Sequence, residues 1–246
     1  MFRASLKRKF MSVEIVVLSA GLGTRMKSQK AKVLHKICGK EMIYHILKES
    51  KKITNNVGVV LYHQKEAVEE VISRDFNDIK ITLQDMQNYP GTGGALLNYR
   101  FEGEKIVVLN GDMPLISESD IKSFFTLEAD IVVGVLRLQD PSGYGRVVIR
   151  EGEVVKIVEQ KDANAEELAI NSVNSGVYLF KKEVLSSLLP KLSNDNAQKE
   201  YYLTDVIELA KSANLTVKAI EVKESAFKGV NSKEDLANAE MLMIAK

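Results

Sequence analysis

Short apolar runs alternate along this chain with stretches in which apolar residues recur at helical spacing, and no other feature constrains the fold as strongly. The apolar runs are strand-sized and lie at Val13–Leu18, Val57–Leu61, Ile79–Leu83, Ile106–Leu109 and Ile131–Leu136. The stretches between them that have the period of amphipathic helices include Met42–Leu47, Ala67–Ile72 and Ile116–Phe125. Because a strand–helix–strand order brings successive strands together in parallel, the sequence predicts an α/β fold with a mostly parallel sheet and helices on both faces.

The middle of the chain departs from this alternation. Arg146–Ile149 and Val154–Glu159 flank a Glu151-Gly152 turn, which predicts a hairpin, and a further strand is expected at Val173–Phe180. We therefore expect residues 143–180 to form a small β-rich lobe beside the main sheet. The polar segment Lys161–Glu167 within it is expected to be a mobile loop.

The end of the chain returns to the α/β pattern. We expect a helix at Tyr202–Ser212, a strand at Thr216–Val222 and a closing helix at Ser232–Ile244, with Ser232 as its N-cap. Residues 1–11 contain four basic side chains but no signal-peptide h-region follows them, so they do not form a secretory signal. We interpret residues 1–11 as a tag or disordered extension and residues 12–246 as one domain.

Composition excludes several classes of function. Hydrophobic residues make up 45% of the 246 residues, so the chain is not intrinsically disordered. The net charge of +1 gives no global basic field, so we expect no nucleic-acid and no membrane partner. Cys38 is the only cysteine, which excludes an intramolecular disulfide and favours a reducing, cytoplasmic location. Any anionic ligand must therefore be held by a local group of residues.

A glycine-rich loop follows the first predicted strand. Its sequence is Leu18-Ser19-Ala20-Gly21-Leu22-Gly23-Thr24-Arg25-Met26, and free backbone N–H groups in such a loop suit phosphate oxygens. The dinucleotide fingerprint fails because Met26 stands at its third glycine, and the Walker A motif fails because Glu41 follows Gly39-Lys40. Arg25 and Lys32 beside the loop suit a triphosphate. An ordinary strand–helix turn with exposed basic residues explains this segment alone about equally well.

An acidic residue follows the fourth predicted strand. Asp112 comes after Gly111, which places it at the carboxyl edge of the sheet, where ligands of open α/β sheets bind. A lone carboxylate with one amide oxygen suits Mg²⁺, because Mg²⁺ keeps its waters and takes other ligands from phosphates. The alternative is a turn-capping aspartate.

The motifs in their order resemble the sugar nucleotidyltransferases, and among these the uridylyltransferase domains that act on N-acetylglucosamine 1-phosphate. The resemblance covers about Val13 to Met243. Besides the glycine loop, it rests on Lys32–His35, Gln84 with Gly91–Gly93, Asn110–Leu115, Gly143–Arg146, Ile157–Ala163, Asn174–Gly176, Asn194–Gln198, Glu200–Asp205 and Gly229–Asn231.

The resemblance implies a Rossmann-like fold of the nucleotide-diphospho-sugar transferase type and a Mg²⁺-dependent transfer of UMP from UTP to N-acetylglucosamine 1-phosphate. It implies catalytic roles for Arg25, Lys32 and Asp112, and metal ligation by Asp112 and Asn231. It implies nucleotide binding by Leu18, Ser19, Ala20, Gly21, Gln84, Gln87, Gly91 and Thr92. It implies sugar binding by Asn110, Gly145, Glu159, Asn174 and Asn231.

Simpler interpretations of these residues remain open. Gln84 also suits an ordinary strand-end polar residue, and Glu159 a solvated strand end. Asn174 suits a strand-edge hydrogen bond, and Asn231 a turn before the last helix. The match to Gln87 is weaker because Asn88-Tyr89-Pro90 lengthens its loop.

The chain also departs from the family pattern. Ala31 stands where the family usually has proline, Ser19 replaces alanine, Asn110 replaces a larger residue and Gly94 stands where relatives often have histidine. These departures affect the fine substrate contacts more than the reaction type, so one alternative is a transferase for another base or sugar. A second alternative is a catalytically silent nucleotide-binding domain, against which the presence of Arg25, Lys32, Asp112 and Asn231 argues. Full-length relatives continue into a left-handed β-helix that carries acetyltransferase activity and forms trimers. No such repeats precede Lys246, so we expect a truncated form or a stand-alone transferase that is a monomer or weak oligomer.

Overall fold

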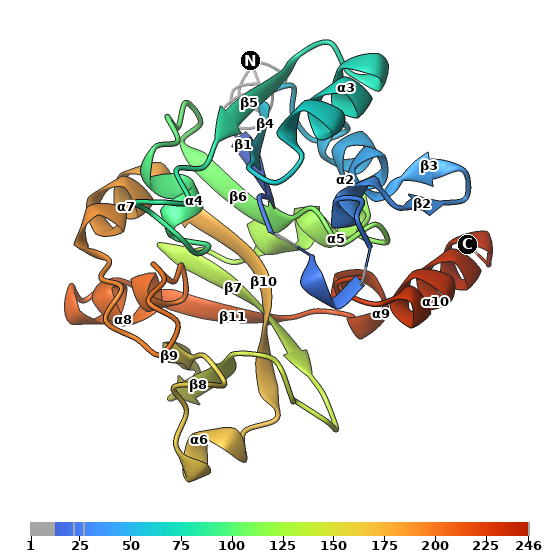
Figure 1. Cartoon of the computed structure of the whole chain (residues 1–246). Coiled ribbons are helices and arrows are strands. Elements are labelled where there is room, and N and C mark those ends of the chain that lie inside the picture. Colours follow the sequence, from blue (N-terminus) through green and yellow to red (C-terminus); the bar gives the residue numbers. More distant parts are fainter. Residues whose placement is uncertain (1–12, 22, 27, 246) are drawn as a thin grey trace, which may run out of the picture.

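The computed structural model describes residues 13–21, 23–26 and 28–245 (Figure 1). The expectation for residues 1–11 lies outside this part of the chain. Within it, the main sheet has nine strands in the order β5-β4-β1-β6-β10-β7-β11-β9-β8. Helices cover both of its faces, and this confirms the predicted α/β class.

The first half of the sheet is parallel and forms as predicted. It consists of β1 (Val13–Ser19), β4 (Val57–Leu61), β5 (Ile79–Leu83) and β6 (Lys105–Asn110). In β1, Ile15 and Val17 pack into the core on one face and Val16 into the core on the other, as the two-residue period of a strand buried on both faces requires. Leu18 pairs with Asn110, so β1 and β6 end side by side.

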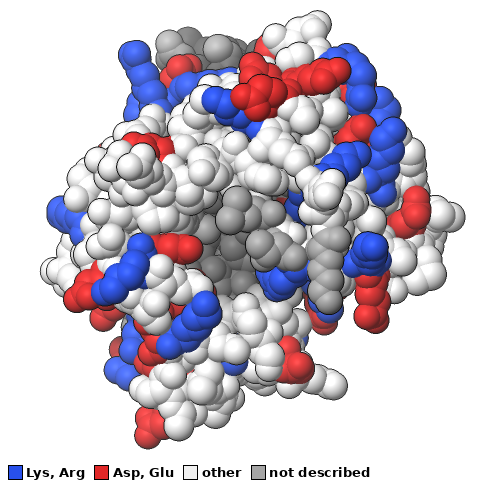
Figure 2. Space-filling view, viewed as in Figure 1, with Lys and Arg blue, Asp and Glu red and all other residues white. Residues whose placement is uncertain are grey.

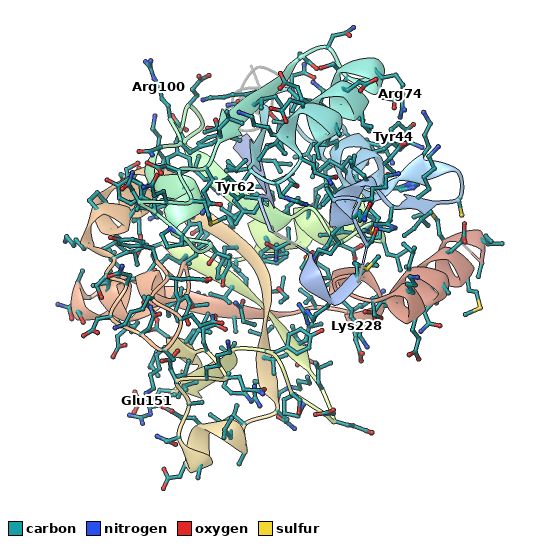
Figure 3. The ribbon with its side chains drawn as sticks, in the orientation of Figure 1. Tyr44, Tyr62, Arg74, Arg100, Glu151 and Lys228 are labelled. Atoms are coloured by element: carbon teal, nitrogen blue, oxygen red, sulfur yellow. The ribbon has the colours of Figure 1, made fainter. Side chains whose placement is uncertain are left out.

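The second half of the sheet differs from the expectation of a separate lobe. The strand β10 (Ser172–Lys181) runs antiparallel between β6 and β7 (Ile131–Arg137), and β11 (Val217–Glu221) lies parallel to β7. Val177 to Phe180 are all buried, which suits a central strand covered on both faces. The hairpin forms as predicted, from β8 (Arg146–Arg150) and β9 (Glu153–Val158). It extends the sheet beyond β11, and Glu151 at its turn is labelled in Figure 3.

Two layers of helices enclose the sheet. One layer contains α2 (Met42–Lys51), α3 (Lys65–Asp75) and α5 (Glu118–Ser123), and the other α4 (Gly94–Leu97), α7 (Lys182–Leu188) and α8 (Asp205–Ser212). The shorter elements are η1 (Thr24–Met26), η2 (Lys32–Leu34), β2 (Lys36–Ile37), β3 (Lys40–Glu41), η3 (Phe124–Thr126), α6 (Ala165–Leu168), η4 (Leu189–Lys191), α9 (Glu224–Phe227) and α10 (Lys233–Ile244).

Side-chain caps set several of the boundaries. Oγ of Ser232 accepts from the N–H of Asp235 at 3.0 Å, so the predicted cap of α10 is confirmed. A similar capping box starts α5 after Ser117. The helix is therefore shorter than the amphipathic helix predicted at Ile116–Phe125. The cap at Asn164 starts α6, so the segment that was expected to be a polar loop ends in a helical turn.

The C-terminal segment returns to the carboxyl edge of the sheet. The helix α10 packs against β2, where Val230, Leu115 and Ile37 share a small apolar cluster. The N–H of Val230 donates to the carbonyl oxygen of Asp112 at 2.8 Å. This contact brings the loop before α10 to the ends of β1 and β6.

Charge is dispersed over the molecule. On the face that Figure 2 shows, basic and acidic side chains are interspersed and neither sign covers the surface.

Candidate active site

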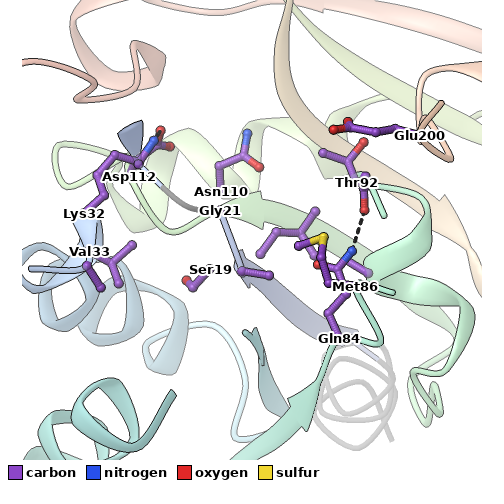
Figure 4. A pocket seen from close by; sticks show the side chains of 16 residues that line it. Ser19, Gly21, Lys32, Val33, Gln84, Met86, Thr92, Asn110, Asp112 and Glu200 are labelled. Carbon is purple, nitrogen blue, oxygen red and sulfur yellow. Dashed lines mark hydrogen bonds and ion pairs between the residues drawn. The ribbon is translucent and has the colours of Figure 1, made fainter. Parts of the chain in front are cut away.

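Two adjoining cavities lie at the carboxyl ends of the central strands. The first, of about 410 Å³, lies between the end of β1, the Lys32 turn and the segment 84–92 (Figure 4). The second, of about 320 Å³, lies between β10, the hairpin and the loop before α10. Leu18, Thr92, Asn110 and Asp112 line both, so the cavities share a wall.

Asp112 stands at this shared wall. Gly111 before it packs so closely on β1 that a Cβ at this position would lie 2.1 Å from Oγ of Ser19. The N–H of Gly111 donates to the carbonyl oxygen of Leu18 at 2.9 Å. These two contacts fix the turn after β6, and the Asp112 side chain remains 15% exposed at the cavity.

Four polar side chains from three parts of the sequence meet at Asp112. Nζ of Lys32 lies 2.5 Å from Oδ2 of Asp112 and 3.0 Å from Oδ1 of Asn231. Nη2 of Arg25 donates to the same Oδ1 of Asn231 at 2.8 Å. The structure thus brings together all of the residues that the sequence analysis assigned to catalysis and to the metal.

The donor set fits magnesium rather than a metal held by protein alone. Oδ2 of Asp112 and Oδ1 of Asn231 both contact the ammonium group of Lys32. The two oxygens therefore face the same position, and that position already holds a positive charge. In the described residues, no group of three or more His, Cys, Asp or Glu side chains could hold a metal. A site with two oxygen donors suits Mg²⁺ that takes its other ligands from water and phosphate.

At the far end of the first cavity, Gln84 fixes a loop. Its Nε2 donates to the carbonyl oxygens of Tyr89 and Gly91, each at 2.9 Å. Because both partners are acceptors, the orientation of the amide is settled, and Oε1 remains for a donor on a ligand. Gly91 has a φ of +94°, and a Cβ there would lie 2.7 Å from the carbonyl oxygen of Tyr201.

The predicted nucleotide-binding residues are gathered with one exception. Of these predicted residues, those that line the first cavity are Leu18, Ser19, Ala20, Gly21, Gln84, Gly91 and Thr92. Gln87 is exposed and lines neither cavity, because the turn in which Asn88 N–H donates to Oδ1 of Asp85 directs it outward. Met86 and Glu200 line the first cavity instead, and only Glu200 had a sequence signal, in the Glu200–Asp205 motif.

The second cavity contains all five predicted sugar-binding residues, namely Asn110, Gly145, Glu159, Asn174 and Asn231. Glu159 is half-buried in its wall rather than solvated. Burial raises the pKa of Glu159, Thr204 Oγ1 lowers it by donating at 3.2 Å, and the charges of Asp162 and Glu200 raise it further. A Cβ on Gly145 would lie 3.3 Å from Oε1 of Glu159, so the missing side chain leaves this wall open.

Tyr178 and Thr204 also line the second cavity and were not assigned a role from the sequence. A signal for Tyr178 exists in retrospect. Asn174, Gly176 and Tyr178 occupy alternate positions, which share one face in a regular strand, although β10 shifts register between Asn174 and Tyr178. Thr204 lies in the Glu200–Asp205 motif, where only the motif as a whole pointed to the site.

Backbone contacts join the walls of the two cavities. Tyr201 accepts from the N–H of Gly93 and donates to the carbonyl oxygen of Pro90, each at 2.8 Å. The N–H of Leu203 donates to Oγ1 of Thr92 at 3.1 Å. The loop of the first cavity is therefore paired with a segment 111 residues away that reaches the second.

Fold and site together define a class, namely the α/β proteins with a ligand site at the carboxyl edge of the sheet. The chain belongs to the nucleotidyl transferase family, whose match extends over residues 14–243.

The sequence relatives support the same family. The chain is 60% identical to the "Bifunctional protein GlmU" of Nitratiruptor sp. over 95% of this chain and 54% of that protein. It is 53% identical to the protein of the same name from Wolinella succinogenes, over 96% of this chain and 55% of that protein. The chain thus spans about half the length of the curated relatives it matches.

Solved structures support the fold. The inositol-1-phosphate CTP transferase from T. maritima superposes with a TM-score of 0.74 at 22% identity, over 95% of each chain. A UDP-glucose pyrophosphorylase complexed with UDP-glucose gives a TM-score of 0.73 at 18% identity, over 96% of this chain and 99% of the other. Across the described residues, we find no helix with the length and apolar character needed to cross a bilayer.

Proposed function

We propose that this domain transfers UMP from UTP to N-acetylglucosamine 1-phosphate, giving UDP-N-acetylglucosamine and pyrophosphate. Family membership and the motif series support this reaction. The observation that carries the proposal is the meeting of Arg25, Lys32, Asp112 and Asn231 at the wall between two cavities.

In this proposal UTP occupies the first cavity. A uracil edge offers one N–H donor and two carbonyl acceptors, and Oε1 of Gln84 is left to accept from that N–H. Backbone groups of Ala20 and Gly21 on one side and of Gly91 and Thr92 on the other complete the recognition. The triphosphate then lies over the loop that ends at Arg25.

The sugar 1-phosphate occupies the second cavity. The Gly145 backbone, Glu159 and Asn174 offer donors and acceptors to its hydroxyls, and Thr92 contributes to binding of the acetamide. Asn110 lies at the wall between the two ligands. This arrangement places the sugar phosphate beside the α-phosphate of UTP.

The reaction is then an in-line displacement. An oxygen of the sugar phosphate forms a bond to the α-phosphorus, while the bond from that phosphorus to the bridging oxygen breaks and pyrophosphate leaves with the electron pair. The nucleophile is already an anion, so no general base is needed. Arg25 and Lys32 position the phosphates and neutralise the charge that develops on them.

Asp112 and Asn231 would hold Mg²⁺ in this scheme. A bound magnesium ion supplies additional neutralisation of the phosphate charge. The role of this chain is to present two oxygen atoms at a fixed point beside Lys32.

We assign to these residues the nucleotidyl transfer alone. The relatives are named bifunctional, and this chain spans about half of their length. We place the reaction in the cytoplasm, without a nucleic-acid partner.

Pyrophosphate release tests this function. The protein is assayed with UTP, dTTP, GTP and CTP, each against N-acetylglucosamine 1-phosphate and glucose 1-phosphate. UTP with N-acetylglucosamine 1-phosphate should give the highest kcat/KM. If another nucleotide and sugar phosphate gave the highest kcat/KM, the domain would be a different transferase. If a nucleotide bound but no pair of substrates reacted, the domain would be a silent nucleotide-binding domain.

A further inference from the structure

Tyr178 lies in the wall of the second cavity, and its hydroxyl contacts a residue that we assign to the sugar. It is 3% exposed, and its ring stacks on Phe180 with the centroids 5.5 Å apart. Nδ2 of Asn174 donates to Oη of Tyr178 at 2.6 Å. Tyr178 lines the second cavity and not the first.

The amide of Asn174 is held from both sides. Its Oδ1 accepts from the N–H of Gly176 at 2.9 Å, while its Nδ2 donates to Tyr178. The pairing of β10 with β7 shifts register between Asn174 and Tyr178, and Gly176 in this bulge has a φ of +78°. The bulge and the hydroxyl together allow one orientation of the amide, which leaves one N–H and one lone pair for a ligand.

We propose that Tyr178 is a positioning residue, which holds the Asn174 amide in the orientation that the sugar 1-phosphate requires. This inference rests on the proposed function. Burial and then the charge of Glu159 raise the pKa of Tyr178, so its hydroxyl keeps its proton across the working pH range. Oη therefore accepts from Asn174 and retains its own proton.

The test is Tyr178→Phe, which removes one oxygen and keeps the ring on Phe180. The KM for N-acetylglucosamine 1-phosphate should rise about 3- to 10-fold, the cost of one buried hydrogen bond. The KM for UTP and kcat should stay within about twofold, because the first cavity lacks Tyr178.

Tyr99→Phe is the matched control. The Tyr99 hydroxyl is also buried, and it donates to Oε1 of Glu14 at 2.8 Å, outside both cavities. Both variants should lower the melting temperature, but Tyr99→Phe should leave both KM values unchanged. A general loss of stability is thereby separated from a loss of positioning.

A double-mutant cycle shows whether Tyr178 acts through Asn174. On an Asn174→Ala background, Tyr178→Phe should change the sugar KM less than twofold. An unchanged sugar KM in the single variant, an equal rise in both KM values, or full additivity would each overturn the positioning role while leaving the function intact. A wild-type protein that turns over no UTP with this sugar would overturn both.

Discussion

Nζ of Lys32 lies 2.5 Å from Oδ2 of Asp112, and the same ammonium group contacts Oδ1 of Asn231. A side-chain cation thus lies between the two oxygens that we assign to magnesium. Arg25 adds a second positive group at Asn231. A divalent ion held by these two oxygens would therefore compete with the Lys32 ammonium group for them.

Lys32→Met tests this competition, because it keeps the chain length and removes the charge. Turnover should fall about 100-fold or more, as expected for loss of a preorganised cation at the phosphates. Binding of Mn²⁺ to the nucleotide-free protein, measured by electron paramagnetic resonance, should become tighter. Lys199→Met, at an exposed position, should change neither. Weaker Mn²⁺ binding in Lys32→Met would contradict this relationship.

Asp112→Asn should abolish most of the activity and preserve the fold. The carboxylate charge is lost, but the main-chain contact of Asp112 with Val230 remains. We expect kcat to fall about 100-fold or more, with an unchanged circular dichroism spectrum. Asp195→Asn, whose side chain is 93% exposed, serves as the control. Retention of full activity by Asp112→Asn would show that the metal ligands lie elsewhere.

Gln84→Glu should weaken nucleotide binding selectively. A carboxylate cannot donate to the carbonyl oxygens of Tyr89 and Gly91, and it is repelled by both. The KM for UTP should rise about tenfold or more, while the KM for the sugar phosphate stays the same. Gln87→Glu is the matched change at an exposed position, and we expect no effect. A larger effect at Gln87 than at Gln84 would restore the role that the motif comparison suggested for Gln87.

The pH dependence of stability should report on Asp205. Burial, followed by the charges of Glu159, Glu208 and Asp162, raises the pKa of Asp205 to about 6 from an ordinary 3.8. The folded state therefore holds this proton more tightly, so its contribution to stability is full below pH 3.8 and is lost as the pH rises to about 6.

Asp205→Asn removes this dependence. The melting temperature of the variant relative to wild type should be higher at pH 7.5 than at pH 4.5. Scanning calorimetry at both values measures the difference, with Asp195→Asn as the control. If the melting temperature of the variant relative to wild type were higher at pH 4.5 than at pH 7.5, the folded state would stabilise the carboxylate form of Asp205. A negative charge in the first turn of α8 favours that form.

Local patterns predicted local structure well and long-range pairing less well. Val57–Leu61 and Ile79–Leu83 are strands over the residues expected. The first is an apolar run, and the second alternates apolar with polar residues. The placement of β10 inside the main sheet depends on pairing with β6 and β7, and no pattern within the strand specifies its neighbours.

The site was predictable only through the resemblance. Arg25 and Asn231 are 206 residues apart, and neither segment alone indicates that they meet. Gln87 is exposed beside the turn at Asp85 and does not line the first cavity, so its predicted role in nucleotide binding stays a prediction. Tyr178 was missed because its role comes from a contact with Asn174 across a bulge.

The pairing of the 90–93 turn with Tyr201 has a consequence for redesign. An exchange of residues 84–94 alone for those of another transferase would leave the incoming turn opposite a foreign partner segment. The segment that we assign to the base and the segment that reaches the cavity we assign to the sugar therefore form a single transferable unit. Chimeras that exchange both together should fold and change nucleotide preference, whereas chimeras that exchange either one should lose both substrates.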